Sequence, residues 1–515
     1  MRILFYSPYS LDANNLPVLL DEAMEYLEDP ANTVWFVTCA GEIRPCLSNA
    51  EKSPIRCMEC KLSSRLLVRQ VKHPNFVHKE LSSFTNEAIT NRVKGQRFKY
   101  DSLDEVKSIC HDGVNIGLGV VSSYVTMTRN LMPEMNSANR SFIEDSLRAA
   151  ALLVEITNQM IDTFQPDVLC LFNGRFNGLR PVMETSLNRR IKTTILECTF
   201  STRIERQRKV RFIDQLPHDI DNGTMLIEEN WKTYSADNKE SVAAEFYVKR
   251  RNGEMASDNV YTGDQDKRKL PVDWDPKKRN FVIFNSSEDE FFSVGESFDR
   301  HKLFANQIDG IRYLIQKTAH DPTIHYYLRI HPNLRSIKFS YHTILREAFV
   351  DYPNLTVVPA DSPISTYELI NRGEKVFVFG STAGVEACYW GKPVVLMGPA
   401  YYMYLDVAYR AKTLDELDEL IFETLEPKPQ LGTLKYALFL FGERGVRSKY
   451  VDFDYRRYKI AGKILAVPLC FAYRGSLIPY VIFTGILRTV NLIPHLIFKK
   501  LTMRKLLVEK APVSQ

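Results

Sequence analysis

Small and hydroxyl-bearing residues gather where an apolar run stops and a helical pattern begins. These residues are Gly380, Ser381, Thr382, Gly384 and Glu386. The first N–H groups and the positive dipole end of a helix favour phosphate, so we predict an anion site here. Simple capping of the helix by Ser381 or Thr382 is the alternative.

A second polar group lies at the end of the expected strand 324–330 and consists of Arg329, His331 and Pro332. Proline cannot continue a ladder of hydrogen bonds, so the strand is expected to end there and to project its polar residues. His331 could donate to a phosphate or to a leaving-group oxygen, or it could be a satisfied structural histidine.

A third polar group follows the apolar run 281–284. It consists of Asn285, Ser286, Ser287 and Glu288. These side chains could bind a ribose or a sugar, or they could cap the following helix. All three groups follow expected strands of one sheet. Because ligands of open α/β sheets bind at the carboxyl edge, their convergence there predicts one binding site.

Apolar strands alternate with helical patterns along most of the chain, which predicts parallel sheets covered by helices. The pattern runs over residues 1–229, is interrupted by a polar, charge-rich stretch at 230–279, and restarts over 280–430. We therefore predict an α/β protein with two Rossmann-like domains facing a cleft, joined by 230–279. Residues 431–515 are expected to form C-terminal helices.

The motifs at 327–334 and 378–387, with the segment 391–395, resemble those of bacterial capsular-polysaccharide biosynthesis glycosyltransferases, a group that includes Kdo-transferase-like enzymes. The resemblance implies a GT-B fold whose second domain binds a CMP-, UDP- or GDP-linked sugar. By this resemblance, His331 and Ser381 with Thr382 would hold the phosphate of the donor. The first domain would bind a glycan or lipid-linked acceptor.

Polar residues at strand ends of the first domain are the candidates for acceptor binding and catalysis. Asn173 and Arg175 follow one expected strand and Glu197 follows the next, while Asp12 and Glu42 lie in loops after the first two strands. Glu197 could act as general base, for which it must lie within about 3 Å of the acceptor hydroxyl. Arg175 could offset charge on the departing nucleotide, or serve as a structural ion-pair partner.

Four cysteines crowd the loop 39–60, at Cys39, Cys46, Cys57 and Cys60. Four thiolates could bind a structural zinc ion tetrahedrally, and free thiols are the alternative. No cofactor is expected for catalysis.

Composition and charge narrow the class of protein. The chain has 515 residues, 45% of them hydrophobic, which is enough for two cores. A net charge of +5 without a basic stripe does not indicate a nucleic-acid binder. The N-terminus lacks a signal pattern and nine cysteines make no disulfide framework, so we expect a cytoplasmic protein.

The C-terminal tail has apolar runs too short to span a bilayer, followed by a basic cluster at 499–510. Such a tail is typical of a peripheral contact with the inner membrane surface, although it could also pack onto the protein. We predict a glycosyltransferase of surface-glycan biosynthesis. A sugar-nucleotide epimerase of similar fold and a non-catalytic assembly or export protein are the alternatives.

Overall fold

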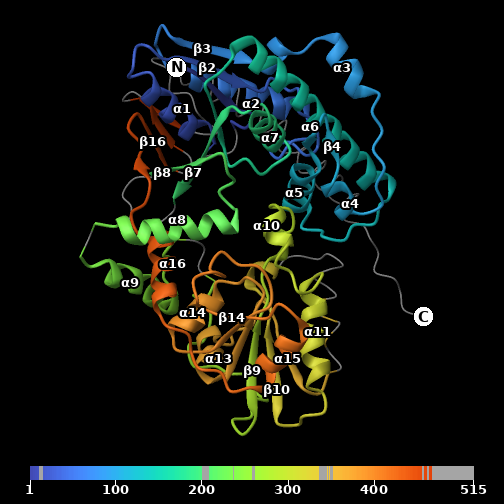
Figure 1. The fold of residues 1–515 in the computed structure, drawn as a ribbon, viewed down its shortest axis with the longest axis vertical. Coiled ribbons are helices and arrows are strands. Elements are labelled where there is room, and N and C mark those ends of the chain that lie inside the picture. The colour runs from blue at the N-terminus through green and yellow to red at the C-terminus, as the bar shows by residue number, and fades with distance from the viewer. Residues whose placement is uncertain are drawn as a thin grey trace. The chain divides into compact units, whose positions relative to one another are not determined.

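The computed structural model describes most of the chain. The described residues are 1–10, 15–199, 208–235, 237–257, 261–335, 345, 347, 349, 352–454, 457–460 and 463–466. They form two compact units (Figure 1). Unit 1 contains residues 1–199 and 206–217 and the chain from 445 onward, and unit 2 contains residues 218–444.

Unit 1 is built on a seven-stranded sheet in the order β15-β8-β7-β6-β1-β2-β3. Its strands are β1 (Arg2–Ser7), β2 (Thr33–Thr38), β3 (Phe76–Glu80), β6 (Val168–Phe172), β7 (Lys192–Thr199), β8 (Arg208–Ile213) and β15 (Val446–Arg447). The five neighbouring strands β7, β6, β1, β2 and β3 are parallel to one another. Strand β8 pairs antiparallel with both of its neighbours, β7 and β15.

The helices of unit 1 cover this sheet, and the smaller strands lie outside it. The helices are α1 (Asn15–Tyr26), α2 (Pro54–Val68), α3 (Glu87–Lys94), α4 (Leu103–Lys107), α5 (Gly117–Thr128), α6 (Ser137–Phe164) and α7 (Arg180–Asn188). The smaller strands are β4 (Cys110–His111), β5 (Val114–Asn115), β16 (Val451–Asp454), β17 (Arg457–Ile460) and β18 (Lys463–Ala466).

Unit 2 is built on a six-stranded, fully parallel sheet in the order β11-β10-β9-β12-β13-β14. Its strands are β9 (Arg279–Phe284), β10 (Ile324–Arg329), β11 (Leu355–Val358), β12 (Lys375–Val378), β13 (Val394–Leu396) and β14 (Tyr409–Arg410). The chain moves from β9 through β10 to β11 and then crosses back to β12, on the other side of β9. The direction of winding therefore reverses between β9 and β12, which is where open α/β sheets form a binding crevice.

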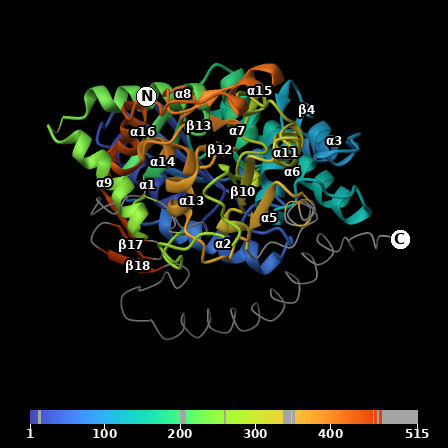
Figure 2. The ribbon, with the colours of Figure 1, turned by 90° about the horizontal axis from the view of Figure 1, so that it is seen from below.

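Several helices of unit 2 cover its sheet, and others pack beside it. The helices of this unit are α8 (Ile220–Thr233), α9 (Lys239–Asn252), α10 (Glu296–Asp299), α11 (Gln307–Lys317), α13 (Thr366–Arg372), α14 (Ala383–Tyr389), α15 (Leu414–Phe422) and α16 (Leu431–Phe441). Helices α13 and α14 lie on one side of strands β9 and β10, and α11 lies on the other (Figure 1). The view from below shows the same separation about β10 and β12 (Figure 2).

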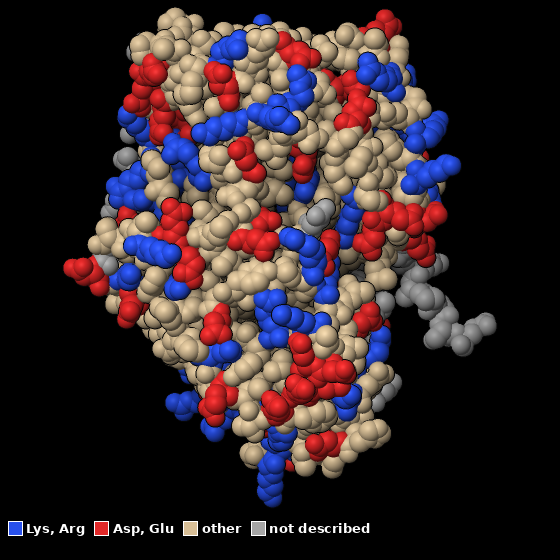
Figure 3. All heavy atoms as spheres, in the orientation of Figure 1, with Lys and Arg blue, Asp and Glu red and all other residues tan. Residues whose placement is uncertain are grey.

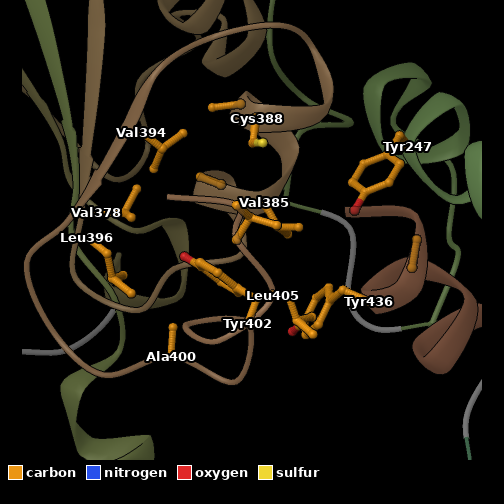
Figure 4. Close-up of a cluster of buried hydrophobic side chains, with 14 of the residues drawn as sticks. Tyr247, Val378, Val385, Cys388, Val394, Leu396, Ala400, Tyr402, Leu405 and Tyr436 are labelled. Carbon is orange, nitrogen blue, oxygen red and sulfur yellow. The ribbon is translucent and has the colours of Figure 1, made fainter. Parts of the chain in front are cut away.

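The core of unit 2 explains why its strands read as apolar runs, because a parallel sheet is buried on both faces. Val378, Val394 and Leu396 project from β12 and β13 into one cluster with Val385 of α14 (Figure 4). Tyr402 lies among these side chains and is 1% exposed. The core therefore fixes the end of β12 and the start of α14 relative to each other.

The structure differs from the prediction that residues 230–279 form an inter-domain connection, because they belong to unit 2. Residues 239–252 form α9, which packs into the core of unit 2 through Val242, Ala243, Phe246 and Tyr247. Charged residues make up much of the rest of this helix. Their number led to the prediction of a linker. Similarly, α16 belongs to unit 2, although 431–515 was expected to be a separate tail.

The C-terminal segment returns to unit 1 as strands rather than helices, at least up to residue 466. Residues 467–515, which include the expected membrane-surface tail, lie outside the described residues. Among the described helices, none combines the length and the apolar character that crossing a membrane requires. On the face drawn in Figure 3, Lys and Arg side chains are interspersed with Asp and Glu.

Candidate functional site

A pocket opens at the carboxyl edge of the unit 2 sheet and has an empty volume of about 590 Å³, including space open to solvent. We call it the basic pocket. It is lined by Arg250, Glu254, Tyr261, Thr262, Phe284, Asn285, Arg329, His331, Pro332, Thr366, Tyr367, Ser381, Thr382, Ala383 and Glu386. The ends of β9, β10 and β12 meet here. The sequence predicted that the polar residues after these strands would converge.

Arg329 is the last residue of β10, and it is a buried cation. Its side chain lines the basic pocket but is only 2% exposed. The guanidinium donates to the carbonyl oxygens of Pro359, at 2.7 Å, and Ser362, at 3.2 Å. Its Nε makes no hydrogen bond to the described residues, and the charge of the Asp361 carboxylate acts on the guanidinium. Burial lowers the pKa of Arg329 to about 10, so the side chain stays charged at neutral pH.

His331 is held so that one ring nitrogen remains for a ligand. Asn285 accepts a hydrogen bond from the backbone N–H of His331 at 2.8 Å. The Nδ1 atom of the ring accepts from the backbone N–H of Asn333 at 3.2 Å, so the proton of the neutral ring is on Nε2. Burial, with the charges of Arg250 and Arg329, lowers the pKa of His331 to about 4. His331 is therefore a neutral donor at physiological pH.

Arg250 reaches the basic pocket from the last turn of α9. Its Nε donates to Glu386 Oε1 at 2.9 Å, and its Nη2 donates to Thr382 Oγ1 at 3.3 Å. The second carboxylate oxygen of Glu386 accepts from the hydroxyl of Tyr367. Glu386, which we expected to bind the donor, is thus a partner of Arg250 and sets the position of its guanidinium.

The hydroxyl residues at the end of β12 have different partners. Ser381 Oγ accepts from the N–H of Ala383 at 3.3 Å, which is a local cap. Thr382 makes no capping bond, and its hydroxyl faces Arg250 instead. Because α14 has only seven residues, its dipole is short. The cationic side chains, more than the helix, make the basic pocket attractive to anions.

Gly380 and Gly384 are required by packing. Gly380 has φ +82°, and a Cβ there would lie 2.6 Å from the carbonyl oxygen of Pro399. A Cβ on Gly384 would lie 2.5 Å from the hydroxyl of Tyr402, which donates to the carbonyl of Ser381 at 2.5 Å. Neither glycine lines the basic pocket, so internal contacts explain both residues.

The loop after β9 divides its predicted residues between two places. Asn285 lines the basic pocket, whereas Ser286 and Glu288 line a second pocket. Ser287 Oγ accepts from the side-chain amide of Asn333 at 3.1 Å, which ties this loop to the loop after β10. The two loops therefore support each other at the sheet edge.

The basic pocket has the chemistry of a phosphate site. Two guanidinium groups, a neutral imidazole N–H and a threonine hydroxyl surround it, together with the exposed carboxylate of Glu254 and the buried carboxylate of Glu386, which is paired to Arg250. Such donors match the oxygens of a phosphate. The pocket holds no nucleophile with a base beside it, so binding and charge stabilisation are what it can supply.

In unit 1, the structure brings three predicted residues together. Asn173 follows β6 in a left-handed conformation, with φ +64°, and its side-chain amide donates to Glu197 Oε1 of β7 at 2.7 Å. Asn173 Oδ1 accepts from the backbone N–H of Arg175, whose Nε donates to Ser122 Oγ at 2.5 Å. Asp12 lies outside the described residues, and Glu42 accepts from the N–H of Ala40 at 2.6 Å.

The four clustered cysteines lie in the loop after β2 and on α2. Burial raises the pKa of the Cys46 thiol to about 12, with a contribution from Cys60. No three of these sulfurs lie within 4.8 Å of one another, and the part of the chain that the structure describes holds one such potential ligand group, His111, Asp112 and Glu155. Because Arg92 pairs with Glu155, that group is an ionic cluster rather than a metal site.

The zinc site at the cysteines stays a prediction, which metal analysis can test. Protein purified without chelators and measured by inductively coupled plasma mass spectrometry would contain about one zinc per chain if the thiolates gather around the ion. A variant with Cys57→Ser and Cys60→Ser would lose it. Less than a tenth of an equivalent in the unsubstituted protein would favour the free thiols.

Among the residues of the basic pocket that sequence reasoning missed are Arg250, Tyr261 and Tyr367. The first two lie in the stretch that we expected to be a connection. Tyr261 packs its ring edge against His331, with centroids 5.3 Å apart. The run of basic residues at 249–251 was a signal for Arg250, but its helix had to be placed against the sheet before it could be used.

The site region matches a known family. Residues 258–415 match the family described as capsule polysaccharide biosynthesis protein. This region contains β9 to β14 and most of the residues that line the basic pocket. The resemblance predicted from the motifs is therefore confirmed over these residues, and the family's role in capsule glycan biosynthesis agrees with the predicted class of function.

Solved structures that match the chain include two transferases from Thermosulfurimonas dismutans. The KpsC β-Kdo 2,4 transferase is 14% identical; the match covers 58% of this chain and 84% of that chain, with a TM-score of 0.35. The KpsC β-Kdo 2,7 transferase is 13% identical; the match covers 56% of this chain and 81% of that chain, with a TM-score of 0.32. Sucrose-phosphate synthase from Thermosynechococcus elongatus matches with 11% identity, 86% and 95% coverage and a TM-score of 0.28. No curated protein matches the chain.

Proposed function

We propose that this chain is a glycosyltransferase that moves a sugar from a nucleotide-sugar donor to a glycan acceptor in capsule polysaccharide biosynthesis. The family match over residues 258–415 supports the biosynthetic setting. The basic pocket at the switch point of the unit 2 sheet supports the donor class, because nucleotide phosphates are the anions that such crevices bind. CMP-, UDP- and GDP-linked sugars all carry this group.

The observation that carries the proposal is the burial of Arg329, which the described residues satisfy through two backbone carbonyls and no hydrogen-bonded carboxylate. A buried charge is costly unless an opposite charge or a set of hydrogen bonds satisfies it. Here two backbone carbonyls accept from the guanidinium, and its Nε has no partner. A phosphate in the basic pocket would supply the missing negative charge.

In this function, residues of the basic pocket would bind the donor phosphate and stabilise the charge that develops during transfer. Arg329 and Arg250 would offset the negative charge that develops on the departing nucleotide, and the Nε2–H of His331 would donate to a phosphate oxygen. On unit 1, we propose Glu197 as the general base that accepts the proton of the acceptor hydroxyl, oriented by Asn173. Arg175 would bind the acceptor beside it.

The acceptor is a growing surface polysaccharide or a lipid-linked glycan in this proposal. The apolar runs and basic residues of 465–510 support a position at the cytoplasmic face of the inner membrane. Loss of membrane-fraction protein after deletion of this segment would support that position.

Substitution of His331 tests the assignment of the phosphate site. His331→Ala should weaken nucleotide binding by about tenfold, which is the effect of one lost donor to a charged group. His331→Gln restores an N–H donor and should recover part of the affinity. Isothermal titration with CMP, UDP and GDP provides the measurement.

A matched control comes from His320, an exposed histidine in the turn after α11. His320→Ala should bind nucleotide as the unsubstituted protein does. Because the pKa of His331 lies near 4, its contribution should be the same at pH 6.5 and pH 8. Absence of binding by every nucleotide and nucleotide sugar would overturn the proposed function.

A further inference from the structure

A second pocket lies at the same edge of the unit 2 sheet and has a different lining. We call it the aromatic pocket, and its empty volume is about 440 Å³, including space open to solvent. Four phenylalanines line it, Phe291, Phe292, Phe304 and Phe379. No function has been given to it so far, although Ser286 and Glu288 on its wall were predicted to bind a ligand.

The two pockets adjoin along the switch point of the sheet. At the end of β9, Asn285 lines the basic pocket and the next residue, Ser286, lines the aromatic pocket. At the end of β12, Phe379 lines the aromatic pocket and Ser381 lines the basic pocket. Both pockets thus share the crevice between β9 and β12.

Different helices border the two pockets. Residues of α13 and α14 line the basic pocket, whereas Gln307 of α11 lines the aromatic pocket. Because α11 lies on the opposite side of the strands from α13 and α14 (Figures 1 and 2), the pockets belong to opposite faces of the sheet. A ligand bound over the sheet edge can therefore extend from one pocket into the other.

The aromatic pocket has a firm floor. A Cβ on Gly310 of α11 would lie 2.7 Å from the Phe379 ring and 3.0 Å from the Phe304 ring. The two rings therefore rest directly on the glycine. Gln307 accepts from the N–H of Ser286 at 3.0 Å and donates to its hydroxyl at 3.0 Å, so the wall that divides the pockets is also fixed.

The rim of the aromatic pocket is polar. Glu288, Lys302 and Asn306 line it. Lys302 lies 5.8 Å above the Phe292 ring and pairs with Asp299 at 2.5 Å. A carboxylate, an ammonium and an amide around aromatic walls can bind hydroxyl groups at the rim while an apolar ring face packs inside.

We propose that the aromatic pocket binds the sugar of the donor, while the basic pocket binds its nucleoside phosphate. The inference rests on the proposed function, since it needs a donor whose phosphate is in the basic pocket. The donor lies across the sheet edge between β9 and β12. Its sugar ring packs on the phenylalanines, and its hydroxyls meet Glu288 and Asn306.

The division of the donor follows from the chemistry of the two linings. The basic pocket has the half-buried Tyr261 beside its cations, which provides ring surface for a nucleobase close to the phosphate. On the rim of the aromatic pocket, Glu288, Lys302 and Asn306 can bind hydroxyl groups. A sugar with several hydroxyls matches that rim better than a flat base does.

Binding of nucleotides and nucleotide sugars to one set of variants tests this assignment. The full-length protein is titrated with UDP, CMP and GDP and with their sugar conjugates, and the best pair is kept. Phe292→Ala should weaken the nucleotide sugar by about fivefold to tenfold and leave the free nucleotide unchanged. Glu288→Gln should act in the same direction. Phe422→Ala, at an exposed position of α15, is the matched control.

The outcomes separate the inference from the proposed function. If no nucleotide or nucleotide sugar binds the unsubstituted protein, the proposed function fails, and this inference with it. If nucleotides bind but the Phe292→Ala variant keeps full affinity for the sugar conjugate, the sugar assignment alone is wrong. Equal weakening of nucleotide and conjugate would place the base in the aromatic pocket and also overturn the assignment.

Discussion

Replacement of Arg329 by methionine should abolish most nucleotide binding while leaving the protein as stable as before. Removing a buried group that donates to a charged ligand weakens binding by about 2–3 kcal/mol, or roughly 30- to 150-fold in Kd. The same change removes a buried cation whose hydrogen bonds to the described residues go to two backbone carbonyls alone. Burial of an unpaired charge opposes folding, so its loss offsets the two lost bonds to backbone carbonyls.

Two measurements on the Arg329→Met variant separate binding from folding. Without ligand, Tm should stay within about 5 °C of the parent value. With saturating nucleotide, the rise in Tm seen for the parent should disappear. Arg372→Met, at an arginine whose side chain is 66% exposed, is the matched control and should change neither value. A folded Arg329→Met variant that binds nucleotide normally would contradict the phosphate assignment.

The carboxyl edge of the unit 2 sheet could be predicted because the strands of a parallel sheet are easy to recognise in a sequence. Its strands are buried on both faces and read as apolar runs, so their ends stand out in the sequence. Asn285, Arg329, His331 and Ser381 each follow such a run, and the structure brings all four to the basic pocket. The sequence could not tell that Ser286 and Glu288 turn into a second pocket one residue later.

Residues on helices were harder to predict, because their position depends on packing rather than on the end of a strand. Arg250 lies on α9, whose charged residues concealed a buried face of four apolar residues. Glu386 was predicted as a donor-binding residue of the motif 378–387, and the structure shows hydrogen bonds from Arg250 and Tyr367 to its two oxygens. Gly380 and Gly384 likewise meet Pro399 and Tyr402, which lie far along the chain.

Unit 1 contains a buried ionic cluster that the sequence pattern did not indicate, because its members come from distant segments. Lys209 of β8 is fully buried and contacts Asp21 at 2.7 Å and both Glu22 and Glu25 at 2.8 Å, all on α1. Asp21 also accepts from the N–H groups of Tyr450 and Val451. The cluster therefore ties α1, β8 and the returning C-terminal segment together.

Replacement of Lys209 by methionine should destabilise unit 1 by about 3–5 kcal/mol, because it leaves buried carboxylates without their shared cation. Methionine fills nearly the same volume, so a cavity does not account for the loss. Thermal unfolding and hydrogen exchange of α1 and β8 provide the measurements. Lys72→Met, at an exposed lysine of the same unit, should leave both unchanged.

The pH dependence of the Lys209→Met variant distinguishes lost charge from lost packing. Burial alone would raise the pKa of Glu22, but the bond from Arg211 and the charge of Lys209 outweigh it, so the pKa lies below its usual value. A carboxyl with a lowered pKa stabilises the fold above its unfolded pKa, near 4.5, and this contribution is lost as the pH falls through the folded value. In the variant, the buried carboxylates can take up protons at a higher pH, so the deficit in unfolding free energy should narrow from pH 7 to pH 5. A deficit that is constant over this range would show that packing, not charge, holds α1 to β8.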